Sequence, residues 1–166
     1  MYDIGLINGF VWQNQTFIKT NIYINDAKIA RISNDFLPAV KVVDLNNHYV
    51  SPGLIDPHVH FELDLGFIKS KDDFSSGTQA AIYGGVTTII DFLEPVDTVE
   101  GLERAFNERM EAASKSHIDF TFHATIKDPK CDLEAFVKKM KSLNIHSLKL
   151  FTTYSESGRK TNDQDI

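Results

Sequence analysis

Two histidines separated by one residue form the first candidate functional site, in the segment Asp56-Pro57-His58-Val59-His60. Alternate side chains of a β-strand share a face, so Asp56, His58 and His60 would point the same way, with the imidazoles about 6.6 Å apart along the strand. Near the C-terminal end of a strand they can bind one metal ion, and Asp56 can orient an imidazole. A bare H-x-H pattern is nevertheless common, and taken alone it favours two ordinary polar residues.

A lysine inside an apolar run is the second candidate, in the segment Ser147-Leu148-Lys149-Leu150-Phe151. Leu148 and Leu150 share one face of the expected strand, and Lys149 takes the opposite one. Burial lowers the pKa of an ammonium group and frees the neutral amine. A neutral amine can add carbon dioxide and become a carbamate, an anionic ligand able to bridge two metal ions. The alternative is a lysine that extends from a strand end to solvent, and this segment alone favours that alternative.

The elements that carry these residues alternate between strands and helices from Pro52 onward. Strands are expected at 54–61, 86–93, 118–126 and 145–151, and helices at 72–83, 97–113 and 132–143. Asp72 or Asp73 can cap the first helix, and Asp97 with Glu100 has the spacing of a capping box at the second. The alternation implies parallel strands, in either an open doubly wound sheet or a (β/α)8 barrel. No G-x-G-x-x-G follows the first strand, which disfavours the nucleotide-binding sheet.

The chain before Pro52 has a different pattern, in which strands follow one another without helices between them. Short strands are expected at 2–6, 15–24, 28–33 and 41–45, separated by turn signals such as Asn8-Gly9 and Asn46-Asn47. We therefore divide the chain into a β-rich module at 1–51 and a β/α region at 52–166. A full barrel needs about 250 residues, so the second region would hold its first four β/α units and is expected to be truncated.

Composition excludes several classes of protein. The 166 residues carry a net charge of −6 and no Lys/Arg-rich run, which disfavours a nucleic-acid partner. No apolar run is long enough to span a membrane, and the N-terminus lacks the features of a signal peptide. The single cysteine, Cys131, excludes an internal disulfide and a cysteine-based zinc site. A cytoplasmic location is expected.

Three passages taken together resemble the amidohydrolase superfamily: PGLIDPHVHF at 52–61, DDFSSGTQAAIYGGVTTIIDF at 72–92 and SLKLFTTY at 147–154. They are most similar to its cyclic-amidase branch, which contains dihydropyrimidinase/hydantoinase, allantoinase and dihydroorotase. The resemblance runs through nearly the whole chain. It implies an α/β fold in which a small β-sandwich module precedes the first half of a (β/α)8 TIM-like barrel, with a centre of two divalent metal ions, usually zinc.

The resemblance also assigns roles to particular residues. His58 and His60 match the metal ligands of the first strand, and Lys149 matches the lysine that becomes the N-carboxylated bridge. Tyr154 resembles the catalytic tyrosine that hydrogen-bonds the oxyanion, and Asp56 matches the aspartate before the histidine pair. The family further uses two histidines and an aspartate on its fifth, sixth and eighth strands, which follow the four strands expected here.

Other polar residues receive simpler interpretations. His123 has a parity that allows it to face the barrel lumen, but we expect a hydrogen-bonded structural residue. Asp91 also has a parity that allows it to face the lumen and support a metal ligand, but we expect a buried, hydrogen-bonded carboxylate. The loop after the histidine pair carries four apolar residues that would either line a substrate pocket or pack beneath a lid, namely Leu63, Leu65, Phe67 and Ile68.

The implied reaction is the opening of a dihydropyrimidine or hydantoin ring to an N-carbamoyl amino acid. Dihydroorotases carry an arginine two residues after the second histidine, where this chain has Glu62, whose charge would repel an anionic substrate. Neutral rings are therefore favoured over dihydroorotate. The alternatives are a dihydroorotase and a non-catalytic fragment of the fold. The chain alone is expected to be inactive and to bind its metal only in part or not at all. Its unpaired strand edges predict a homo-oligomer.

Overall fold

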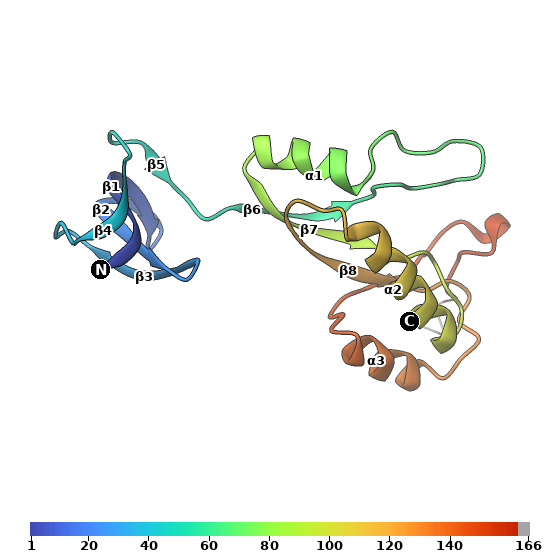
Figure 1. Ribbon diagram of the computed structural model, residues 1–166. Coiled ribbons are helices and arrows are strands. Elements are labelled where there is room, and N and C mark those ends of the chain that lie inside the picture. The colour runs from blue at the N-terminus through green and yellow to red at the C-terminus, as the bar shows by residue number, and fades with distance from the viewer. Residues whose placement is uncertain (163–166) are drawn as a thin grey trace. The chain divides into compact units, whose positions relative to one another are not determined.

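The computed structural model describes residues 1–162. These residues form two compact units, one at Met1–Pro52 and one that begins at Gly53 (Figure 1). Each unit has a β-sheet of its own. None of the helices in the described part of the chain is long and apolar enough to cross a membrane.

The first unit is built on one long strand. Strand β1 (Tyr2–Gln13) pairs antiparallel with β2 (Thr16–Asn25), which pairs antiparallel with β3 (Lys28–Ser33). Strands β4 (Ala39–Asp44) and β5 (Tyr49–Val50) both pair parallel to β1, which gives the order β3-β2-β1-β4. The buried side chains of this unit include Val11, Ile22 and Tyr23.

The Asn8-Gly9 signal does not end the first strand, so the prediction of a short strand at 2–6 is wrong. Asn8 adopts a left-handed backbone conformation with φ of 59°, and the register of β1 against β2 shifts between Leu6 and Gly9. The Asn8 side chain donates to Asp44, and its backbone N–H donates to the Asn21 side chain. These bonds hold the residue in a β-bulge, and the strand continues beyond it.

The second unit is a parallel sheet with helical crossovers. Its strands lie in the order β6 (Leu54–Val59), β7 (Val86–Phe92), β8 (Asp119–Thr125) and β9 (Leu148–Lys149). The crossovers contain α1 (Phe74–Tyr83), α2 (Val99–Ala113) and α3 (Leu133–Ser142) (Figure 1). The predicted β-α-β-α-β-α-β order is confirmed, although only two residues of the strand expected at 145–151 form a ladder.

Helix boundaries follow the side chains that satisfy their first N–H groups. Asp73, one of the two caps that the sequence offers for α1, forms a reciprocal pair with Ser76. Asp132, where the third helix is predicted to begin, caps α3. The capping box of Asp97 and Glu100 is wrong, because the Thr98 side chain accepts from Gly101 and α2 begins one residue later than that box requires.

One apolar layer lies between the helices and the sheet. It joins strand residues such as Ile89 and Phe122 to helix residues such as Leu102 and Phe136, all nearly fully buried. Gly77 of α1 permits a close approach, because a Cβ at this position would overlap the ring of Phe61. This layer fixes the outer face of the strands, and the candidate site lies on the other face.

Candidate active site

The two histidines lie side by side at the end of β6, with ring centroids 5.3 Å apart. His58 is exposed, and His60 is half-buried. The pairing of β6 with β7 is irregular between Asp56 and Val59, so Pro57 and His58 depart from a regular strand. In the described part of the chain, no protein hydrogen bond occupies a ring nitrogen of either histidine. Both rings can therefore donate a lone pair to an ion.

The side chain of Phe92, the last residue of β7, is the common neighbour of the site. Its ring centroid lies 4.7 Å from that of His58 and 4.6 Å from that of His60, and the second pair is stacked. The Lys149 amine of β9 lies 4.3 Å from the same centroid, within the range of a cation–π contact. The structure thus brings His58, His60 and Lys149 together from two strands that flank β7 and β8.

Burial lowers the pKa of His60 below its usual range, and the positive charge of Lys149 adds to this effect. The carboxylate of Asp91 acts in the opposite direction. The neutral imidazole is the form that binds a metal ion, so the surroundings of His60 favour the state that ligation requires.

His123 of β8 is a structural residue, as the sequence predicts. Its Nε2 lies 2.8 Å from the carbonyl oxygen of Pro57, and its Nδ1 lies 2.5 Å from the hydroxyl of Ser147. In the neutral ring, Nε2 therefore carries the proton and donates to Pro57, while Nδ1 accepts from Ser147. Both nitrogens are occupied, and the ring connects β6 to the segment that leads into β9.

The structure does not place Asp56 and Tyr154 where the roles given by the resemblance require them. The Asp56 carboxylate accepts from the backbone N–H of His58 at 3.1 Å rather than from an imidazole. Tyr154 has a left-handed backbone with φ of 68°, and its side chain is 62% exposed. Its ring packs at the edge of Phe151, 6.1 Å between centroids, and does not reach the histidine cluster.

A cavity of about 170 Å³ adjoins the cluster. Four basic side chains line it, from the end of β6, from α2, from β9 and from the segment after β9: His60, Arg109, Lys149 and Arg159. Apolar side chains complete much of the wall, including Leu63, Leu65, Pro95 and Phe151. Asp64 and Glu94 also line it. The cavity therefore presents charged groups of both signs beside apolar surface, a combination typical of sites for small organic molecules.

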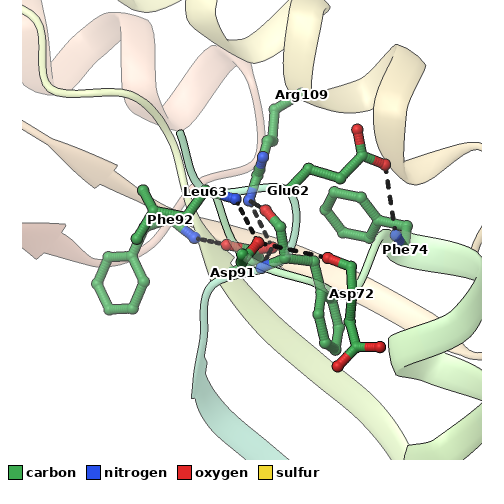
Figure 2. A network of polar contacts seen from close by, with 9 residues as sticks. Glu62, Leu63, Asp72, Phe74, Asp91, Phe92 and Arg109 are labelled. Atoms are coloured by element: carbon green, nitrogen blue, oxygen red, sulfur yellow. Dashed lines mark hydrogen bonds and ion pairs between the residues drawn. The ribbon is translucent and has the colours of Figure 1, made fainter. Parts of the chain in front are cut away.

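The loop after His60 contributes to the cavity with only part of its apolar set. Leu63 and Leu65 line the wall, as one of the two interpretations of the sequence expects. Phe67 and Ile68 are 87% and 59% exposed, so they neither line the cavity nor pack beneath a lid. The Glu62 carboxylate turns toward α1 and accepts from the backbone N–H of Phe74 at 3.4 Å (Figure 2). The predicted repulsion of an anionic substrate therefore has no support from this geometry.

Sequence reasoning missed Arg109, because the helix at 97–113 is predicted from its apolar residues, Met110 among them, and Arg109 is not one of these. Arg109 is buried and forms an ion pair with the fully buried Asp91, Nη2 to Oδ2 at 2.8 Å. Met110 is 40% exposed. The carboxylate expected at Asp91 is thus confirmed as buried and hydrogen-bonded, and its partner on α2 is the residue that no periodicity could identify.

The residues present suit part of a metal centre. Two unpaired imidazoles and one amine are suitable donors for a borderline ion such as zinc, the amine once it has become a carbamate. Among residues 1–162, no group of three or more His, Cys, Asp or Glu side chains converges as a complete site. The geometry fits the ligands of the first and fourth strands, and the remaining ligands would have to come from elsewhere.

Comparison with known proteins places these features in a family. The model of the amidohydrolase family matches residues 49–164. The D-hydantoinase of Geobacillus stearothermophilus is 37% identical over 90% of this chain and 32% of its own length. The dihydropyrimidinase of Dictyostelium discoideum is 33% identical over 96% of this chain and 32% of its own length. The chain spans about a third of the length of the curated relatives that it matches.

Solved structures agree with the half-barrel fold. The structure of D-hydantoinase from Bacillus sp. AR9 matches 98% of this chain and 36% of its own chain, with a TM-score of 0.88 at 30% identity. A dihydroorotase structure matches more distantly, with a TM-score of 0.53 at 20% identity, and shows the fold alone. The family match runs through β6, β7, β8 and β9, so it includes every strand that brings a side chain to the Phe92 ring. Since the match covers more than half of the chain, the chain belongs to the amidohydrolase family.

Proposed function

We propose that this chain supplies the first metal ligands of a hydrolase that opens cyclic amide rings of the hydantoin or dihydropyrimidine type. The observation that carries the proposal is the gathering of His58, His60 and Lys149 around the Phe92 ring. The relatives named D-hydantoinase and dihydropyrimidinase support the class of ring. The product would be an N-carbamoyl amino acid.

In this proposal His58 and His60 would hold one divalent ion through neutral imidazoles, and Lys149, once carboxylated, would supply a ligand to both ions. The Lys149 ammonium would first lose one proton, and the neutral amine would then attack carbon dioxide, forming the N–C bond as one C–O π bond opens and releasing a second proton. The two losses together convert the cation beside the Phe92 ring into an anion with two oxygen donors. When bound, the ions, expected to be zinc, would lower the pKa of water and polarise the ring carbonyl.

The cavity suggests how a ring would be held. Leu63 and Leu65 would contact its apolar substituent, and Arg159 would donate to a carbonyl oxygen. We keep Tyr154 as the proposed donor to the developing oxyanion. This role requires its exposed ring to turn from the Phe151 edge toward Lys149, five residues earlier in the chain. Asp56 would act through the backbone of His58, whose N–H it already accepts.

The test has two arms. The purified 166-residue chain is assayed for bound zinc and for hydrolysis of hydantoin, dihydrouracil and dihydroorotate. Residues 1–162 are also joined to the complementary two thirds of the Geobacillus stearothermophilus D-hydantoinase, which supplies the remaining barrel. We expect weak zinc binding and no turnover by the chain alone, and turnover of hydantoin and dihydrouracil by the chimera. Lys149→Ala and His60→Ala in the chimera should abolish that turnover.

Two alternatives make different predictions in the same experiment. A dihydroorotase would give a chimera that prefers dihydroorotate, and the basic residues around the cavity keep this alternative open. A non-catalytic fragment would give a folded chimera that turns over none of the three rings. We further propose that the protein is cytoplasmic and that it self-associates. Sedimentation of the purified chain would test the self-association through the measured mass.

A further inference from the structure

The buried Asp91–Arg109 pair holds the backbone on both sides of the candidate site. Asp91 lies on β7 with its side chain toward α2, on the face opposite to the Phe92 ring, and it is 0% exposed. One carboxylate oxygen accepts from the backbone N–H of Phe92 at 2.6 Å, and the other accepts from that of Phe61 at 3.3 Å. Arg109 completes the arrangement by donating to the carbonyl oxygen of Phe61 at 2.6 Å.

These contacts take over where the backbone ladder stops. Strand β6 ends at Val59, which is paired with Asp91, and the next two residues lie beyond the strand. At this point both polar groups of the Phe61 backbone are bound by side chains, the N–H by Asp91 and the carbonyl by Arg109. The ion pair therefore satisfies the backbone polar groups just after β6, as hydrogen bonds to β7 do within the strand.

The two residues held in this way are the immediate neighbours of the site. Phe61 follows His60 in the chain, and Phe92 carries the ring on which His60 is stacked, with an interplanar angle of 20°. A shift of either backbone segment would change the position of the His60 ring relative to His58 and Lys149. Charge-assisted hydrogen bonds in a water-poor interior are well suited to prevent such shifts.

We propose that Asp91 and Arg109 are positioning residues of the metal site, which set the place of His60 and of the Phe92 ring through the backbone of Phe61 and Phe92. In this role the pair acts through the backbone, although Arg109 also lines the cavity. The part of the inference that concerns metal affinity rests on the proposed function. The part that concerns the backbone does not, and it can be measured without metal.

The test compares Arg109→Met with Leu102→Val in the 166-residue chain. Leu102 is a fully buried residue of the same helix, and its substitution weakens the core without removing a contact to Phe61 or Phe92. Amide hydrogen exchange of Phe61 and Phe92 is followed by NMR in the absence of metal. Arg109→Met should reduce their protection about tenfold or more beyond any change in Leu102→Val, because local opening then precedes global unfolding.

Zinc titration supplies the second readout. Loss of a group that orients a ligand typically weakens metal binding about 10- to 100-fold, and Arg109→Met should show such a loss while Leu102→Val does not. Arg109→Lys keeps the charge beside Asp91 on a side chain one atom shorter, so it should recover part of both the protection and the affinity. Should Arg109→Met not fold, Arg109→Lys and Asp91→Asn provide the same comparison.

The outcomes separate the two proposals. Equal amide protection and equal zinc affinity in the Arg109 variants and in Leu102→Val would overturn the positioning role. Loss of protection at Phe61 and Phe92, together with a chimera that takes up no zinc and gives no turnover, would support the backbone part and contradict the proposed function. Loss of both protection and affinity, with partial recovery in Arg109→Lys, is the expected result.

Discussion

The Lys149 amine lies 4.3 Å from the centre of the Phe92 ring, although 57 positions of sequence separate the two residues. The same ring packs against His58 and His60, so one aromatic side chain contacts all three proposed ligands. An aromatic face attracts a cation and accepts a stacked imidazole, and it offers no polar atom that would compete for a metal ion. Phe92 can therefore gather these residues without entering the chemistry.

Replacement of Phe92 by Leu should loosen the cluster while keeping an apolar side chain. We expect the free energy of unfolding to fall by about 1–3 kcal/mol, as for other losses of buried aromatic volume, and zinc binding to weaken. Denaturant unfolding and zinc titration measure the two effects. Phe106→Leu is the matched control, because Phe106 packs on Phe122 at 6.0 Å and does not contact the histidines. Equal zinc binding by the two variants would contradict the role of Phe92.

The pKa of His60 should respond to the charge of Lys149. Lys149→Met removes a positive charge that lowers this pKa, so the pKa should rise but stay below 6.5, because burial is the larger cause. NMR titration of the His60 ring protons measures the change, and an unchanged or lower pKa would contradict the placement of the amine.

The same shift gives stability a pH dependence. A depressed pKa means that the unfolded chain binds a proton at His60 before the folded chain does. The contribution of His60 to stability is therefore fully present above about pH 6.5 and is lost as the pH falls from there toward the pKa of the folded state. In Lys149→Met this loss should be smaller, which denaturant unfolding at a series of pH values would show.

Carboxylation of Lys149 can be tested directly. A neutral amine forms the carbamate, so exposure of the chain to 13C-bicarbonate with zinc should produce a carbamate 13C signal that the Lys149→Arg variant lacks. Arginine keeps the positive charge near Phe92 and has no amine to react. A signal of equal intensity in both proteins would place the reaction on another lysine.

Gly77 should matter for the site because of Phe61. A Cβ at Gly77 would overlap the Phe61 ring, so Gly77→Ala must displace the residue that follows His60. We expect a loss of about 1–3 kcal/mol of stability, despite the better helix propensity of Ala, together with weaker zinc binding. Gly84→Ala is the control, since its Cβ would meet only the carbonyl oxygen of Ala81 at 3.4 Å. Thermal unfolding of both variants makes the comparison.

Much of the site was accessible from the sequence because it depends on strand parity. The alternation of Val59 with His60, and of Lys149 with Leu150, is enough to separate the site face from the core face, since Val59 and Leu150 pack against the core. The convergence of distant strands came from the resemblance, since spacing alone favoured simpler interpretations of both motifs. The position of Tyr154 followed from neither, because its left-handed backbone turns the ring toward solvent.

Arg109 shows what periodicity cannot supply. A guanidinium on the buried face of a helix is costly unless a carboxylate faces it, and here that partner is Asp91 on another strand. The sequence indicates a buried carboxylate at Asp91 but gives no sign that Arg109 is its partner. The Asn8 bulge has a similar origin, because its hydrogen bonds are accepted by side chains of two other strands, Asn21 and Asp44. In both places a tertiary contact overrides a local signal.

Zinc binding by single-histidine variants of the 166-residue chain tests whether His58 and His60 are metal ligands. We predict weak, saturable binding to the wild type that is lost in both His58→Ala and His60→Ala. Binding should persist in His146→Ala, because the wild-type His146 ring pairs with the exposed Asn144 side chain away from the site. Zinc that binds the His58 and His60 variants as tightly as the wild type would show that these histidines do not hold the ion.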